Sequence, residues 1–296
     1  MYGVPSAVPV VPIQRLDDPR LADYVGLRDR DLRRAAEGLF VGEQLLVVER
    51  MLEIAGAVRS VLVAERLVAR VAPRVPPEVP LYSAPQALLE QVAGFPLHRG
   101  VLAIGSRSAL PRPSLDELAS GSGTSARGRL LLACEDIVGI DNIGMLFRVA
   151  AAFAADGVLL SPRCHDPLYR KSLRVSIGHA LHVPFHRAAL WPEALERLRE
   201  RGIAVIGAAL DDGAAELDAL PVPERAALVV GTEFAGISEA VRRRCDALIR
   251  IPMAPGVDSL NVAVAAGICL HRFRRAIDRR AAAGGGSDRS AAGAVP

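Results

Sequence analysis

The chain has 296 residues, which is enough for about two domains with a buried core each. Hydrophobic residues make up 51% and charged residues 23%, a balance typical of globular proteins and not of disordered ones. The net charge of +3 does not itself require a nucleic-acid partner, no uncharged apolar run is long enough to span a membrane, and we expect no secretory signal.

The cysteines and basic residues exclude several classes of protein. Four separated cysteines form no Cys-x-x-Cys pair, so we interpret them as reduced, mostly buried thiols of a cytoplasmic protein and expect no metal. The single lysine, Lys171, follows Arg170, which rules out the Gly-Lys-Ser/Thr of a phosphate-binding P-loop. No Gly-x-Gly-x-x-Gly follows a plausible strand, and neither His-Glu-x-x-His nor Gly-x-Ser-x-Gly occurs.

Arginine clusters leave two interpretations open. They could neutralise the phosphates of a nucleic acid, or they could be solvated helix faces. The clusters are Arg170, Lys171 and Arg174; Arg242, Arg243 and Arg244; and Arg272, Arg274 and Arg275.

In chain order, composition divides the protein into five parts. Residues 1–12 are Pro- and Val-rich and are expected to be flexible. Residues 13–107 form a first domain, with a helix-like segment at 43–56 and a strand-like segment at 58–64. The Pro, Ser and Gly of residues 108–128 are typical of a linker, 129–280 form a second domain, and the low-complexity tail 281–296 is expected to be disordered.

The second domain alternates strands with helices, which predicts an α/β fold. Such alternation favours a mainly parallel sheet with helices on both faces, whose ligands bind beyond the carboxyl ends of the strands. The predicted strands are 129–135, 157–161, 203–210, 226–231 and 247–253, and the predicted helices are 143–155, 191–202, 237–245 and 260–277.

Three of the loops after these strands contain polar residues that ordinary turns do not require. In the first loop Asn142 suits a helix cap, but Arg148 is the only charged residue from 143 to 155. A buried guanidinium needs an anionic partner, so we expect either a structural ion pair or a functional site there. The second loop contains Glu233 between two glycines, where a plain turn is the alternative to a functional role. The third contains Ser259 and Asn261 at the mouth of an apolar helix, where capping is the simplest explanation.

The three loops together resemble the signatures of the SpoU (TrmH-like) RNA ribose methyltransferases. The order is Asn-x-Gly-x-x-x-Arg, then Gly-x-Glu-x-x-Gly-x-Ser, then Ile-Pro-Met followed by Ser-Leu-Asn-Val-x-Val-Ala. The resemblance covers residues 129–276, and a softer one relates the first domain, including His98 and Gly100, to the family's small ribosomal-protein-like domain. The matching residues are Asn142, Gly144 and Arg148; Gly231, Glu233, Gly236 and Ser238; and Ile251, Pro252, Met253, Ser259, Leu260, Asn261, Val262, Val264 and Ala265.

The resemblance implies a SPOUT fold with a C-terminal trefoil knot, a homodimer, and transfer of a methyl group from S-adenosylmethionine to a ribose 2′-hydroxyl of rRNA or tRNA. It implies that Arg148 activates or orients that hydroxyl. It gives supporting catalytic roles to Asn142, Glu233, Ser259 and Asn261, and cofactor contacts to Gly231, Thr232, Gly236, Ile251, Met253 and Leu260.

Two departures from the family pattern concern the cofactor loops: Phe234 stands where a second glycine is usual, and Ala254 precedes Pro255. Three alternative functions stay open. They are a base-methylating SPOUT enzyme, a non-catalytic RNA-binding protein of the same fold, and an α/β enzyme acting on a small molecule.

Overall fold

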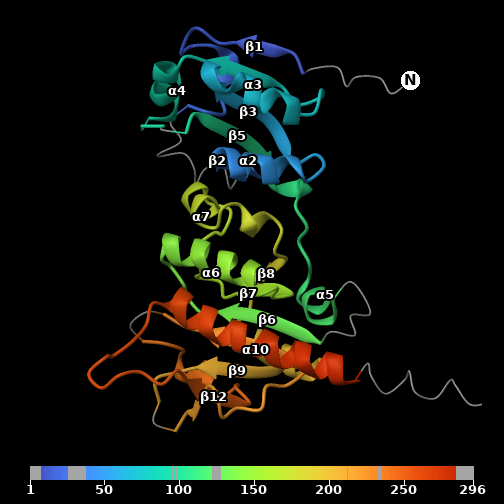
Figure 1. Ribbon diagram of the computed structural model, residues 1–296, viewed down its shortest axis with the longest axis vertical. Helices are drawn as coiled ribbons and strands as arrows, with labels where there is room; N and C mark the ends of the chain where they lie inside the picture. Colours follow the sequence, from blue (N-terminus) through green and yellow to red (C-terminus); the bar gives the residue numbers. More distant parts are fainter. Residues whose placement is uncertain are drawn as a thin grey trace, which may run out of the picture. The chain divides into compact units, whose positions relative to one another are not determined.

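The computed structural model describes residues 8–25, 38–94, 96–97, 99–121, 128–211, 213–232 and 235–284 (Figure 1). The chain divides into two compact units. Unit 1 consists of residues 1–111 and 166–182, and unit 2 consists of residues 112–165 and 183–296. Within the described ranges, no helix is both long and apolar enough to cross a membrane.

Unit 2 is built on a seven-stranded sheet in which every neighbouring pair of strands is parallel, which confirms the predicted α/β class with a mainly parallel sheet. The strand order is β10-β12-β9-β11-β6-β7-β8. The strands are β6 (Arg129–Cys134), β7 (Gly157–Leu160), β8 (Phe185–Arg187), β9 (Ala204–Ala208), β10 (Ala215–Glu216), β11 (Arg225–Val230) and β12 (Ala247–Arg250).

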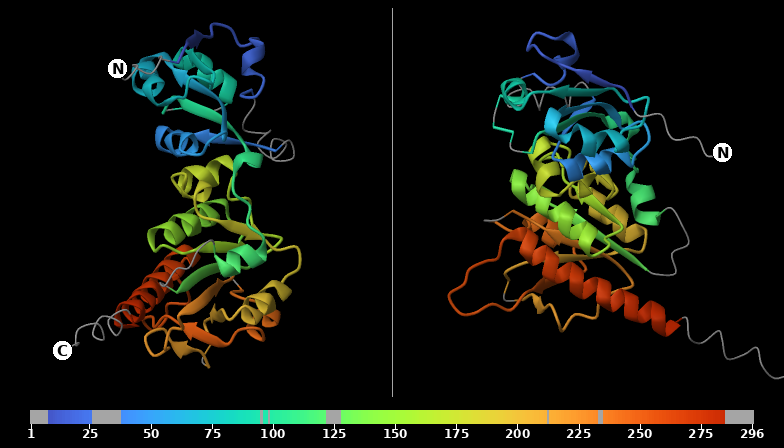
Figure 2. Two further views of the ribbon diagram at one scale, coloured as in Figure 1. Left: turned by 90° about the vertical axis from the view of Figure 1, so that its right-hand side faces the viewer. Right: turned by 45° about the horizontal axis from the view of Figure 1, so that its top comes forward.

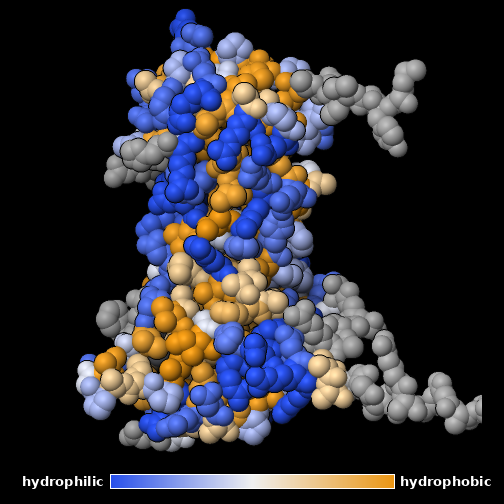
Figure 3. All heavy atoms as spheres, viewed as in Figure 1, coloured by the Kyte–Doolittle hydropathy of each residue, from blue (hydrophilic) through white to orange (hydrophobic). Residues whose placement is uncertain are grey.

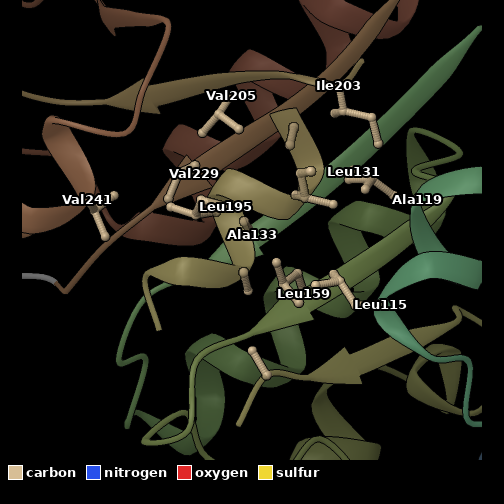
Figure 4. Close-up of a cluster of buried hydrophobic side chains, with 14 of the residues drawn as sticks. Leu115, Ala119, Leu131, Ala133, Leu159, Leu195, Ile203, Val205, Val229 and Val241 are labelled. Carbon is tan, nitrogen blue, oxygen red and sulfur yellow. The ribbon is translucent and has the colours of Figure 1, made fainter. Parts of the chain in front are cut away.

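Helices cover both faces of this sheet because alternate strand residues are apolar on each side. On one face α5 (Leu115–Ser120), α8 (Glu193–Glu200) and α9 (Glu239–Arg242) contribute to a hydrophobic core that includes Leu131 and Val229 (Figure 4). On the other face α6 (Ile140–Ala152) and α10 (Val262–Gly284) lie side by side, and α10 packs on β6 and β11 (Figures 1 and 2).

Unit 1 has a five-stranded mixed sheet in the order β1-β4-β3-β5-β2. The buried carboxylate of Glu43, at the end of β2, pairs with Arg170 and Arg174 of α7, which joins the 166–182 segment to this unit. The strands are β1 (Val10–Pro12), β2 (Leu39–Glu43), β3 (Val58–Ala64), β4 (Leu81–Ala84) and β5 (Val101–Ser106). The helices are α2 (Leu45–Leu52), α3 (Val68–Val71), α4 (Gln86–Ala93) and α7 (Arg170–Val175), with short 3-10 turns at Pro19–Leu21, Glu65–Leu67, Ala72–Arg74, Arg107–Ala109 and His179–Leu181.

The structure differs from the sequence-based boundaries at several points. The expected linker 108–128 contains α5, which forms because Ser114 and Glu117 make a capping box and Leu115 and Leu118 enter the core. The tail expected from 281 begins as the last turn of α10, since alanines continue the helix to Gly284. The expected flexible N-terminus contains β1, whose residues 10–12 pair with β4. Residues 1–7 and 285–296 lie outside the described ranges.

Candidate functional site

The carboxyl ends of the central strands of unit 2 converge on a cavity of about 390 Å³. Its wall combines the ends of β9, β11 and β12 with the loops that follow them and with the first turns of α10. All the predicted cofactor-binding residues line it: Gly231, Thr232, Gly236, Ile251, Met253 and Leu260. Its size suits a small organic ligand, since such sites commonly enclose about 300–1,000 Å³.

The 231–238 loop owes its shape to two glycines. Thr232 and Gly236 exchange two backbone hydrogen bonds of 3.0 Å, which hold the start of the loop, directly after β11, against its second half. A Cβ at Gly231 would stand 2.0 Å from the carbonyl oxygen of Gly236, and Gly236 has φ +63°. Because that contact is with the loop's own backbone, glycine at 231 is required for the turn before any ligand is considered.

Asn261 links two signatures that are 119 residues apart in the sequence. Its Nδ2 donates to Oδ1 of Asn142 at 2.9 Å, while its own Oδ1 accepts from the backbone N–H of Ala263 at 2.9 Å. Asn261 is therefore the cap of α10, and the expected capping role for Ser259 is wrong; Ser259 is exposed and lines the cavity. Asn142 does not cap α6 either, because that helix begins at Ile140 after Gly139 and has no side-chain cap.

Arg148 is exposed, so the expectation of a buried guanidinium is wrong. It lies three residues after Met145 on the outer stripe of α6, and Met145 is 36% exposed as well. The residues from 143 to 155 are apolar around much of the helix because α6 presents an apolar stripe to the surface, not because every side is buried. Within the described part of the chain Arg148 forms no hydrogen bond or ion pair, which leaves its five N–H donors available to an anion.

Two residues of the second signature lie outside the described ranges, namely Glu233 and Phe234, as does His98 of the first domain. The structure therefore places the 231–232 and 235–238 parts of the loop and not its tip. The predicted role of Glu233 remains a prediction.

Sequence reasoning missed Glu135, which is 5% exposed at the end of β6. Its carboxylate accepts from the backbone N–H of Ser238 at 2.7 Å, from the Ser238 hydroxyl at 2.7 Å and from the indole N–H of Trp191 at 3.1 Å. The available signal was an acidic residue directly after a buried strand that ends at the ligand-binding edge of a parallel sheet. Next to it, the Arg163 guanidinium hydrogen-bonds to Asp136 and lowers the pKa of that carboxyl.

Most of the arginines in the predicted clusters are used in ion pairs within the chain. Arg242 pairs with Asp211 at 2.6 Å and Arg274 with Asp156 at 3.1 Å. The same holds for Arg170, Arg174, Arg243, Arg244 and Arg272. Arg275 has no ion pair among the residues that the structure places. Of these paired arginines only Arg170 and Arg274 have nearly buried side chains, so a structural role is clearest for these two.

The cysteines are free, as predicted, and three of them are buried. Burial raises the pKa of Cys245 and of Cys269 to about 12. A thiol with so high a pKa is protonated at neutral pH and is a poor nucleophile. Although Cys269 lines the cavity, covalent catalysis by its thiolate is disfavoured.

Comparison with known proteins agrees with this geometry. The SpoU rRNA Methylase family model matches residues 129–271. An uncharacterized tRNA/rRNA methyltransferase of Mycobacterium tuberculosis is 36% identical over 278 residues, which cover 92% of this chain and 94% of that protein. The chain therefore belongs to the SpoU rRNA methylase family, and the family predicted from the three signatures is confirmed.

Solved structures show the same fold. A protein of the TrmH family from Porphyromonas gingivalis is 26% identical, with a TM-score of 0.70 over 84% of this chain and 94% of that chain. The SpoU methyltransferase AviRb from Streptomyces viridochromogenes, solved in complex with the cofactor AdoMet, is 24% identical, with a TM-score of 0.73 over 90% of this chain and 100% of that chain.

The geometry of the 231–238 loop predicts that Gly231→Ala destabilises the protein. The added methyl group would force the loop backbone apart, at a cost of about 1–3 kcal/mol in the free energy of unfolding. Thermal denaturation should show a melting temperature several degrees below that of the wild type. Gly267→Ala in α10 is the control, because its Cβ would meet Val149 at an ordinary 3.5 Å. Equal melting temperatures for the Gly231 variant and the wild type would contradict the proposed cause.

Proposed function

We propose that the protein is an RNA methyltransferase that transfers a methyl group from S-adenosylmethionine to a ribose 2′-hydroxyl of rRNA or tRNA. The observation that carries this proposal is the hydrogen bond between Asn142 and Asn261, which brings the first signature to the third beside the cavity formed by the second and third. Family membership supports RNA methylation, and the signature set supports the ribose as the acceptor.

S-adenosylmethionine is the cofactor that the cavity suits. The wall offers apolar surface from Leu260, Ile251 and Val230 and backbone groups from Gly231 and Thr232, which fit an adenosine ring system and its ribose. The related AviRb structure contains this cofactor. When bound, the cofactor supplies a methyl group already activated on a positively charged sulfur. The protein then contributes mainly alignment and exclusion of water.

Arg148 is the proposed catalytic residue. A ribose hydroxyl is a poor nucleophile at neutral pH and must lose its proton as it attacks. Since an arginine side chain keeps its own proton, Arg148 orients the hydroxyl and an adjoining RNA phosphate through its planar set of donors, and an oxygen of that phosphate takes the proton that the hydroxyl loses. The hydrogen bond between Asn142 and Asn261 fixes the first turn of α6 relative to the start of α10. Ser259 and Glu233 are further groups that we propose position the ribose.

Unit 1 and the chain path after β12 complete the proposal. Unit 1 binds the RNA substrate, as its resemblance to a ribosomal-protein-like domain implies, and the protein acts in the cytoplasm.

We further propose that the segment from Ile251 onward passes through a loop of unit 2 to form a trefoil knot. In the sheet, β12 is separated from β11 by β9, whereas α10, which follows β12 in the chain, packs on β6 and β11. The chain therefore crosses back over the sheet after β12, which supports this path.

A homodimer is proposed through the outer faces of α6 and α10. Met145, Val264 and Ile268 are 36%, 49% and 40% exposed, although large apolar side chains usually avoid such exposure in groups. Figure 3 shows hydrophobic side chains over the first half of α10 and hydrophilic ones over its second half. With the two-fold axis of the dimer near the apolar half of α10, the partner subunit would cover these side chains and would lie close to Arg148.

The function is tested by mapping 2′-O-methylated riboses across rRNA and tRNA from cells with and without the protein. A site that disappears on deletion and reappears when purified protein and S-adenosylmethionine are added supports the proposal. Methylation of a base in place of the ribose would support the alternative SPOUT chemistry. RNA binding without any methyl transfer would support the non-catalytic alternative.

Arg148→Ala should lower the single-turnover rate of methyl transfer by a factor of about 100 or more, the scale of one lost hydrogen-bond donor to developing negative charge. The melting temperature should not change, since the side chain is exposed. The affinity for S-adenosylhomocysteine should change little, and Arg148→Lys should also fail because a point charge does not replace a planar fork. A folded Arg148→Ala protein that methylates RNA at the normal rate would reject this role.

Asn142→Ala and Asn261→Ala should separate capping from catalysis. The Asn261 variant loses the cap of α10, which costs about 1 kcal/mol, whereas the Asn142 variant loses no cap. We expect both to slow methyl transfer and only Asn261→Ala to lower the melting temperature. Asn261→Asp should restore the stability because its carboxylate still accepts from Ala263. A loss of stability in Asn142→Ala equal to that in Asn261→Ala would contradict the assignment.

Val264→Glu and Ile268→Glu should dissociate the dimer because they place charge in an apolar contact. Light scattering at micromolar concentration should give twice the chain mass of 31.4 kDa for the wild type and the single mass for the variants. Leu190→Glu is the control, an exposed apolar residue outside α6 and α10. A fully active wild-type monomer would overturn the proposed interface.

A further inference from the structure

Glu135 holds both ends of the 231–238 loop. Its backbone N–H donates to the carbonyl oxygen of Val230, the last residue of β11 before the loop, at 2.8 Å. Its carboxylate accepts from the backbone N–H and the hydroxyl of Ser238, where the loop ends. The Ser238 hydroxyl in turn accepts from the backbone N–H of Val241 at 3.3 Å, so the contact extends to the first turn of α9. The residue directly after β6 therefore contacts both ends of the loop.

The donor set requires a carboxylate at this position. Three N–H or O–H groups point at its two oxygens, and among the described residues no cation pairs with it. A glutamine has the same shape, but one of its two terminal atoms is a donor. Whichever way that amide turns, its NH₂ group faces either the Ser238 N–H or the Trp191 N–H. The substitution therefore sets one N–H group against another in a partly buried contact, which is more costly than losing a fully exposed hydrogen bond.

We propose that Glu135 is a positioning residue that keeps the described parts of the 231–238 loop, residues 231–232 and 235–238, in the positions that bind the cofactor, and that Trp191 reports a change in those positions. The inference rests on the proposed placement of S-adenosylmethionine in the cavity. Gly231, Thr232 and Gly236 line that cavity between the two points that Glu135 fixes. Trp191 is the only tryptophan of the chain, and its indole N–H shares the Oε1 atom of Glu135 with the Ser238 hydroxyl. A ligand that tightens or shifts the loop alters the surroundings of this indole.

The test compares the wild type with Glu135→Gln by titration with S-adenosylhomocysteine, followed by calorimetry and by tryptophan emission. The wild type should bind the ligand with a change in Trp191 emission. Glu135→Gln should bind about tenfold more weakly, the scale of one lost hydrogen bond to a charged group. Its emission change on binding should be smaller or absent. Glu196→Gln is the matched control, because this half-exposed carboxylate of α8 pairs with Arg244 and makes no contact with Ser238 or Trp191 among the hydrogen bonds of the described residues.

The melting temperature of each variant separates positioning from general stability. A purely structural role would lower the melting temperature of Glu135→Gln and leave the affinity of the folded protein unchanged, and this result would overturn the proposal. Ser238→Ala is the milder second variant: it keeps the backbone contact, removes the hydroxyl contact and should weaken binding by a smaller factor. If the wild type itself does not bind S-adenosylhomocysteine, the proposed cofactor site fails together with this inference. If the wild type binds and Glu135→Gln binds equally well, only the inference about Glu135 fails.

Discussion

The parallel register of the unit 2 sheet is the constraint from which the site follows. Cys134 at the end of β6 pairs with Val230 at the end of β11, so the loops after these two strands leave the sheet side by side. The next two strands, β9 and β12, also end at this edge of the sheet, where Ala208 is paired with Ile249. Because all strands point the same way, signatures that are more than a hundred residues apart in the chain must meet at one edge. An antiparallel sheet of the same strands would have divided them between two edges.

At this edge of the sheet, some single residues make two different kinds of contact at once. Asn261 uses its carbonyl oxygen to cap α10 and its amide NH₂ to bind Asn142, so the acceptor and the donor of one side chain serve two different partners. Glu135 likewise accepts from Ser238 and from Trp191 while its backbone extends the β6–β11 ladder. Capping and the contact between two signatures are therefore not alternative explanations for Asn261. The structural bond fixes the orientation in which the other end of the side chain can act.

The sequence predicted the long, regular elements and the identity of the signature loops, but not the features that depend on tertiary contact. The five predicted strands of unit 2 are present within a few residues of their expected bounds, because short buried apolar runs can be recognised from the local sequence. The edge strands β8 and β10 have three and two residues and no apolar run to mark them. The sequence did not predict α5 because this helix lies in a Ser- and Gly-rich stretch. The exposure of Arg148 could not be predicted because the apolar residues of its helix face both the core and the surface. The position of Glu135 after a buried strand was a local signal, but its contact with Ser238 spans 103 residues and could not be predicted from either segment alone.

The exposed Arg148 and the exposed apolar stripe beside it have a common explanation in the proposed dimer. Arginine is abundant in this chain, but most arginines of its clusters pair with carboxylates of the same unit, as Arg242 does with Asp211. Arg148 lacks such a partner among the described residues, and its neighbour Met145 belongs to the surface that a second copy would cover. Covering that surface removes water from one side of the guanidinium, which strengthens its attraction to an anion. The anion that the proposed reaction brings there is a phosphate of the RNA. Assembly of the dimer and binding of the substrate would then favour each other through one unpaired side chain.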